Sequence, residues 1–193
     1  MPPDATARVG ENQAEMSKWV AMLRGINLGS RNRVSMATLR QLVEEGGVGK
    51  NAQIYLQSGN VIFESEEWSE EKVIDSLEAR IRERLELEIV VLARSGEEIT
   101  KVARTYPFGR RDPGSLHVTF LSAEPDSERV QSVPASEFEP DEFKIIGREV
   151  YLHLPHGYGR SKLSNASFEK RLGVSATTRN WRTVGALAEM ATG

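Results

Sequence analysis

The sequence predicts an α+β protein made of two ferredoxin-like halves, each an antiparallel sheet with helices packed on one face. The first observation is a βαββαβ order of elements over residues 18–92. The second is a βαββα order from Leu116 onward, which nearly repeats the first unit and indicates an internal duplication. The 193 residues, 39% of them hydrophobic, are enough to bury a core. We therefore expect a disordered tail over 1–16, a first subdomain over 17–94, and a second subdomain with the C-terminal helices over 95–193.

Apolar periodicity and capping residues predict the elements of the first half. The apolar run 18–23 has the length of a strand and suits one that is buried on both faces. Ser35 has the position of a helix N-cap, because apolar residues then recur at helical spacing. The other predicted elements are hairpin strands at 54–56 and 61–63 around the turn 57–60, a helix capped by Ser69 with Val73, Leu77, Ile81 and Leu85 facing the core, and a strand at 89–92.

The second half begins with a helix that Ser95 and Glu98 open as a capping box. This helix ends near Tyr106, because the following proline disfavours helical geometry. The remaining elements are a strand at 116–121, a short helix at 126–133, a hairpin of 143–146 and 150–154 about Gly147, a helix that ends near Gly173, and one that starts near Asn180. The sequence shows no obvious fourth strand in this half.

Composition excludes several classes of protein. The chain has no cysteine, which removes disulfides, thiolate metal sites and cysteine nucleophiles and fits a reducing cytoplasm. No apolar run approaches the ~20 residues of a membrane span. With 25 basic and 28 acidic residues, the net charge of −3 argues against a general polyanion-coating protein. We expect a cytoplasmic protein without a metal, a cofactor or a membrane partner, and we leave its oligomeric state open.

A basic, glycine-containing loop is the main candidate for a binding site. Residues 156–182 carry six basic residues and one acidic residue, a net charge of +5. Within them, 157–162 places two glycines, a hydroxyl and two cations just before a predicted helix, which suits an anion site. Tyr158 could stack a base or a sugar. Lys162 is a weak candidate for a proton-transfer or covalent step, because we expect it to be partly buried beside other cations. The alternative is that the glycines only turn the chain.

Two further polar segments add candidates. Residues 177–180 repeat the pattern before the last helix, with Thr178 as an N-cap and Arg179 as a second clamp on the anion. The loop 24–33 is long for a strand-to-helix connection, where ~2–6 residues are usual. Each segment has a structural alternative, in which its polar residues only cap helices or shape loops. The candidate ligand-binding residues are Arg24, Asn27, Tyr158, Arg160, Ser161, Lys162, Arg179 and Asn180.

The sequence offers little for catalysis. The three histidines are His117, His153 and His156, and none belongs to a metal-binding or nucleophile-elbow motif. We interpret His117 as a satisfied structural group on its strand. The catalytic residues, if any, are unknown.

Four short motifs resemble a known family. Residues 23–29, 55–61, 159–163 and 177–181 resemble the bacterial family catalogued as domain of unknown function 1697, over almost the whole chain from 18 to 189. The resemblance implies an α+β fold of ferredoxin-like halves and a bacterial cytoplasmic protein. It implies no activity.

Our leading hypothesis is a protein that binds a phosphate-bearing small molecule, a nucleotide or a phosphometabolite, at the loop 159–162. The second reading is a nucleic-acid binder that uses the same basic face. The third is a non-enzymatic interaction module whose polar motifs hold the two halves together. We also expect the loop after the first strand and the turn 57–60 to lie at opposite ends of the first sheet, so that Asn27 and Asn60 do not share a site within one half. The alternatives are that the long loop folds back, that the second half bridges the two residues, or that the turn 57–60 is structural.

Overall fold

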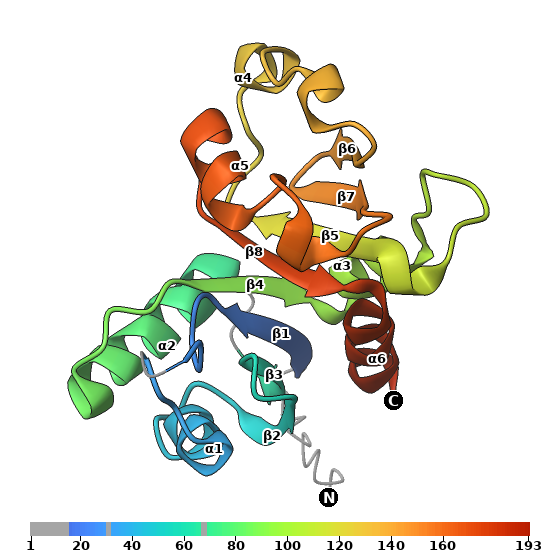
Figure 1. The fold of residues 1–193 in the computed structure, drawn as a ribbon. Helices are drawn as coiled ribbons and strands as arrows, with labels where there is room; N and C mark the ends of the chain where they lie inside the picture. The colour runs from blue at the N-terminus through green and yellow to red at the C-terminus, as the bar shows by residue number, and fades with distance from the viewer. Residues whose placement is uncertain (1–15, 30–31, 67–68) are drawn as a thin grey trace, which may run out of the picture.

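The computed structural model describes residues 16–29, 32–66 and 69–193 (Figure 1). The tail predicted over 1–16 therefore lies outside the described residues, except for Met16. Two four-stranded antiparallel sheets and six α-helices make up this part of the chain, so the predicted α+β class is confirmed. The proposed division at residue 95 stays a prediction.

The first half has the predicted βαββαβ order. Its sheet has the strand order β2-β3-β1-β4. Its elements are β1 (Ser17–Leu23), α1 (Met36–Glu44), β2 (Lys50–Tyr55), β3 (Asn60–Ser65), α2 (Glu70–Leu85) and β4 (Val91–Ser95).

The second half repeats this topology completely. Its sheet has the order β6-β7-β5-β8, which is the order of the first sheet with each strand replaced by its counterpart. The expected lack of a fourth strand is wrong, since β8 fills this place at the edge of the sheet. The elements are β5 (Leu116–Leu121), α4 (Ser127–Gln131), β6 (Glu142–Ile146), β7 (Glu149–His153), α5 (Asn165–Leu172) and β8 (Ala176–Asn180).

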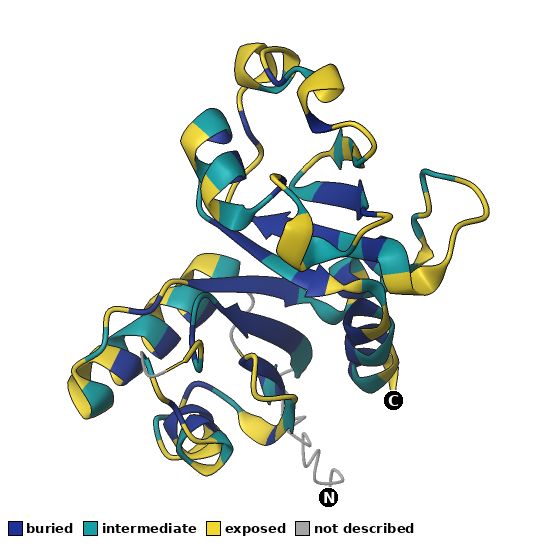
Figure 2. Cartoon of the chain, viewed as in Figure 1, coloured by how far each residue is buried: buried dark blue, intermediate teal, exposed yellow. Residues whose placement is uncertain are grey.

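One further helix follows each half, α3 (Gly96–Arg104) after β4 and α6 (Trp181–Thr192) after β8. These two helices pack against each other and against the inner faces of both sheets. The outer faces are covered by α1 and α2 in the first half, and by α4 and α5 in the second, which lie at opposite ends of the molecule (Figure 1). The burial colouring follows this layering, with the strands largely buried and the outer sides of the helices exposed (Figure 2).

Local capping explains where the helices start. Ser35 accepts from the Thr38 amide at 3.0 Å, and Ser95 and Glu98 form the predicted capping box. The predicted cap at Thr178 is wrong, because Asn180 caps α6 by accepting from the Thr183 amide at 2.8 Å. None of the helices in the described ranges is both long enough and apolar enough to cross a membrane.

Candidate functional site

Arg24 joins the two halves instead of facing a ligand. Its guanidinium donates two hydrogen bonds of 2.6 Å to the carboxylate of Glu169, in α5 of the other half. One oxygen of Glu169 also accepts from the amide of Ala176 at 2.9 Å, which fixes the carboxylate. The bidentate geometry is the strong form of an arginine–carboxylate pair. Arg24 is therefore engaged within the protein.

Asn27 shapes its own loop. Its side-chain oxygen accepts from the Val34 amide, and its amide group donates to the carbonyls of Val34 and Gln57, all at 2.9 Å. The contact with Gln57 corrects the expectation that the loop after β1 and the turn before Asn60 lie at opposite ends of the sheet. Both β1 and β2 are antiparallel to β3, so their C-terminal ends meet at one edge.

Arg179 is buried, and all the donors of its side chain form hydrogen bonds within the protein. Its guanidinium has five N–H groups. They reach the side chains of Asn60 and Thr177 and the carbonyls of Leu23, Ser58 and Thr178. Burial lowers the pKa of Arg179 to about 10, and none of these acceptors is a carboxylate. Arg179 thus leaves no donor for the ligand-clamping role that its sequence position indicated.

A pseudo-symmetric counterpart of Arg179 lies in the first half. Arg94 occupies the same register in β4 as Arg179 in β8, opposite Val20 and Val118 respectively. Its guanidinium donates to the carbonyl of Leu121, at the end of β5, as Arg179 donates to the corresponding Leu23 at the end of β1. Each half therefore sends one buried arginine into the other.

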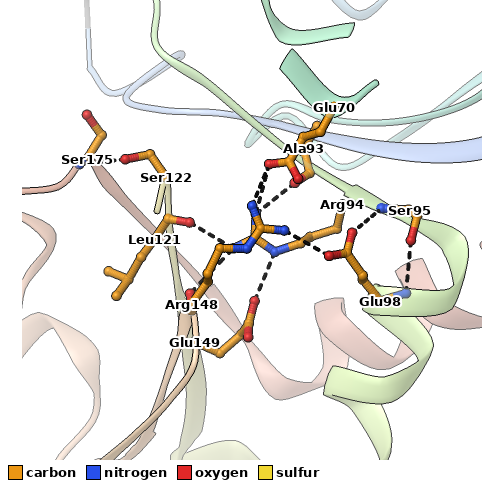
Figure 3. Close-up of polar contacts among 10 residues, drawn as sticks. All are labelled: Glu70, Ala93, Arg94, Ser95, Glu98, Leu121, Ser122, Arg148, Glu149 and Ser175. Atoms are coloured by element: carbon orange, nitrogen blue, oxygen red, sulfur yellow. Dashed lines mark hydrogen bonds and ion pairs between the residues drawn. The ribbon is translucent and has the colours of Figure 1, made fainter. Parts of the chain in front are cut away.

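The two arginines differ in their counter-charges. Arg94 donates to Glu149 at 2.9 Å, and Arg148 bridges Glu70 and Glu98 at 2.8 Å each, which forms an ion network between the halves (Figure 3). Burial alone would raise the pKa of Glu98, but the Ser95 amide and the charges of Arg148 and Arg94 lower it overall. The sequence analysis did not single out this network, because its members are far apart in the chain.

The loop 157–162 keeps its two cations free. The side chains of Arg160 and Lys162 are exposed and make no hydrogen bond or ion pair with any described residue. The expected partial burial of Lys162 is wrong, which removes the reason for giving it a catalytic role. Ser161 accepts from the Leu163 amide at 2.9 Å and so shapes the loop. The loop also stops short of α5, whose N-cap is Ser164.

A cavity of about 370 Å³ adjoins the two cations. Its lining includes His156, Arg160 and Lys162, together with the segment 137–141, which carries Glu137, Glu139 and Asp141. Glu137 is paired with Arg171 at 2.8 Å. The lining of the cavity therefore contains both basic and acidic residues.

Beneath the same loop lies a group of polar side chains, which we call the polar cluster: His117, Thr119, Tyr158, Asn165 and Thr178. Thr119 and Thr178 share a hydrogen bond of 2.7 Å, and Thr178 donates to the side-chain oxygen of Asn165 at 2.6 Å. The hydroxyl of Tyr158 donates to the hydroxyl of Thr178 and accepts from the backbone amide of Asn165, both at 3.3 Å. The loop thus covers a hydrogen-bonded network that joins β5, β8 and α5.

His117 is the member of the polar cluster whose buried ring nitrogen lacks a hydrogen-bond partner among the described residues. Its ring stacks on Tyr158 with a centroid distance of 5.4 Å and an interplanar angle of 26°. Its Nδ1 is buried and has no hydrogen-bond partner among the described residues, so our interpretation of His117 as a satisfied structural group is wrong. Burial lowers the pKa of His117, and the carbonyl of Ser115 opposes this shift more weakly.

The first half shows that the fold does not require polar residues at the strand positions of the polar cluster. By strand register, His117 corresponds to Trp19, Thr119 to Ala21, and Thr178 to Ala93, and all three counterparts belong to the apolar core of the first half. Buried polar groups cost free energy unless they are hydrogen-bonded, so apolar residues would suit these places equally well. A comparison of the two halves, strand against strand, is the signal that could have located the polar cluster.

Fold and site together define a duplicated ferredoxin-like α+β protein with a polar cluster in its second half only. A solved structure, that of conserved bacterial protein SP0830 from Streptococcus pneumoniae, is similar in fold, with a TM-score of 0.69 and 22% identity over 92% of this chain and 99% of that one. Residues 16–151 match the family described as "Protein of unknown function (DUF1697)", and the chain belongs to this family. The matched residues stop before the loop 157–162, so the motifs at 159–163 and 177–181 lie outside them. No curated protein matches the chain.

Proposed function

We propose that the protein binds a phosphate-bearing small molecule, a nucleotide or a sugar-like phosphometabolite, at the loop 157–162. The observation that carries the proposal is the state of Arg160 and Lys162, which are exposed beside a cavity of about 370 Å³ and pair with no residue in the described ranges. Other candidate cations, Arg24 and Arg179, are engaged in contacts between the halves. Arg160 and Lys162 would hold the phosphate, since guanidinium and ammonium groups are its usual ligands.

The acidic residues in the cavity lining would select what else the ligand carries. Glu139 and Asp141 make no side-chain hydrogen bond or ion pair with a described residue and so can accept hydrogen bonds. Sugar hydroxyls are suitable donors, as in dinucleotide sites where a carboxylate binds a ribose hydroxyl. A ligand with a phosphate and a sugar would satisfy both the basic and the acidic residues of the lining. A cytoplasmic location, where such metabolites occur, fits the absence of cysteine.

The nucleic-acid reading is the weaker alternative. A polyanion that followed the basic face would pass the carboxylates of the segment 137–141, and like charges repel. The interaction-module reading draws support from Arg24 and Arg179, but it leaves Arg160 and Lys162 without a role.

Isothermal titration calorimetry at low salt tests the proposal. We expect ribose 5-phosphate or a nucleoside monophosphate to bind the wild type, and Lys162→Gln to weaken binding about tenfold, the effect of one lost charge-assisted hydrogen bond. Lys170→Gln is the matched control, because Lys170 is an exposed, unpaired lysine on α5. The proposal fails if no phosphate compound binds, or if both variants bind like the wild type.

A further inference from the structure

We infer that the first half binds an extended acidic peptide in a groove between α1 and the edge strand β2. The groove has a volume of about 510 Å³. Its lining includes Met36, Ala37 and Arg40 of α1, together with Ile54, Leu56 and Gln57 at the end of β2. None of these residues lines the cavity beside Arg160 and Lys162, so the inference does not depend on the proposed function.

The free edge of β2 offers backbone groups to a further strand. β2 is the outermost strand of its sheet and lies beside α1 (Figure 1). The amide of Leu23 donates to the carbonyl of Gly59, so residues 59, 61 and 63 bond to β1, and residues 60 and 62 bond to β2. Ile54 faces Val61, and its N–H and C=O groups therefore point away from β3. Extended peptides bind such an edge by adding a strand to the sheet.

Leu56 keeps an apolar side chain at the surface in a strained conformation. It is 53% exposed, and its φ of +61° lies in the left-handed region, which is unfavourable for a residue with a Cβ atom. By strand register Leu56 corresponds to Gly147, which has a φ of +60°. The second half thus has glycine, the residue suited to this conformation, where the first half carries leucine. A strained residue that lines a groove indicates a functional role for its side chain.

Arg40 gives the groove a positive charge. It is the only charged residue among the described residues that line the groove. Its side chain is exposed and makes no hydrogen bond or ion pair with a described residue. A carboxylate on the peptide would complement this guanidinium, and no acidic residue of the lining would repel it.

The spacing along α1 and β2 sets the position of that carboxylate. Glu44, at the end of α1, accepts from the amide of Ala52 in the middle of β2 at 2.9 Å. Met36, at the start of α1, lines the groove together with Leu56, which follows β2, so the helix runs antiparallel to the strand. Arg40 lies four residues from Met36, a rise of about 6 Å, and two residues of an added strand advance about 6.6 Å. A peptide with an acidic residue two positions from an apolar one therefore presents both side chains to the groove.

Short synthetic peptides test the inference. The probes are acetylated and amidated, and they carry Glu two residues before or after Leu, Ile, Val or Phe, among serine and threonine residues. We expect at least one of them to bind the wild type in fluorescence anisotropy. The same peptide with Lys in place of Glu should bind at least about tenfold more weakly, the effect of one lost charge-assisted hydrogen bond. The amide of Ile54 should become protected from hydrogen exchange, because it gains a backbone partner.

Two variants of the groove are paired with controls. Leu56→Gly removes the apolar side chain and relieves the strained φ, so we expect at least about tenfold weaker binding with little change in melting temperature. Leu56→Met keeps an apolar side chain and should retain binding. Arg40→Gln should also weaken binding about tenfold. The controls Ile146→Ala and Arg110→Gln should bind like the wild type, because each removes an exposed side chain outside the groove.

Three results would overturn the inference. They are no binding of any peptide at about 1 mM, equal binding of the Glu and Lys peptides, and wild-type binding by both Leu56→Gly and Arg40→Gln. Dimers of the wild type in analytical ultracentrifugation that Leu56→Gly abolishes would assign the groove to a second copy of the chain instead. None of these results bears on phosphate binding at 157–162, which ribose 5-phosphate and Lys162→Gln test separately.

Discussion

Arg179 gives the clearest prediction for a single residue. Arg179→Ala would leave the acceptors on Asn60, Thr177, Leu23 and Ser58 without their buried donor. Because unsatisfied buried groups each cost about 1–3 kcal/mol, we expect the free energy of unfolding to fall by at least about 3 kcal/mol. Urea unfolding without any ligand measures this loss.

Arg182→Ala is the matched control for that measurement. Arg182 lies three residues further along the chain and is exposed, with no hydrogen bond or ion pair to a described residue. We expect its removal to change the free energy of unfolding by no more than about 0.5 kcal/mol. Equal stabilities of the two variants would show that Arg179 does not hold the halves together.

Distance along the chain decides which residue roles the sequence can predict. The caps at Ser35, Ser69 and Ser95 were predictable, because each accepts from an amide three residues away. Arg24 meets Glu169 across 145 residues, and Arg179 meets Asn60 across 119. A sequence shows that a cation is present but not which distant acceptors surround it, which is why the sequence predicts ligand-binding roles for both arginines.

At the scale of elements, β8 shows where periodicity fails. Four of its five residues are polar, and the buried Thr177 and Arg179 are satisfied by hydrogen bonds instead of apolar contacts. Hydrophobic alternation, the main signal for a strand, is therefore absent. The other strands and helices, which bury apolar stripes, were predicted to within a few residues.

The ion network at the start of α3 predicts a dependence of stability on pH. The pKa of Glu98 is lower in the native state than its ordinary value of 4.5, so the unfolded chain binds this proton more readily. The carboxylate therefore stabilises the fold above the unfolded-state pKa, and this contribution is lost as the pH falls through the folded-state pKa. We expect the free energy of unfolding to fall less steeply with acid in Glu98→Gln than in the wild type.

Glu97→Gln controls for the removal of an acidic residue from the same helix turn. Glu97 is exposed, and its side chain makes no hydrogen bond or ion pair with a described residue. Its variant should keep the wild-type slope of unfolding free energy against pH below about pH 5. Parallel curves for Glu98→Gln and the wild type would contradict the stabilising role of the network.

At the scale of the whole molecule, duplication and divergence explain both the fold and the site. Each half sends an arginine from its last strand to the end of the other half's first strand, which ties the two units together. The halves differ where the second replaces Trp19, Ala21 and Ala93 of the first with polar residues. The duplication was predictable from the order of elements. The polar cluster was not, because it requires the strand register of both sheets.

The most direct test of the central claim is a map of amide chemical shifts during titration with a nucleoside monophosphate. A 1H–15N NMR spectrum of the full chain reports every site of binding at once. We predict that the shifts concentrate at 157–162 and in the segment 137–141 that lines the same cavity, and that the amides near Arg94 and Arg179 stay in place. Saturable shifts confined to another face of the molecule, or none at millimolar nucleotide, would contradict the assignment of this site.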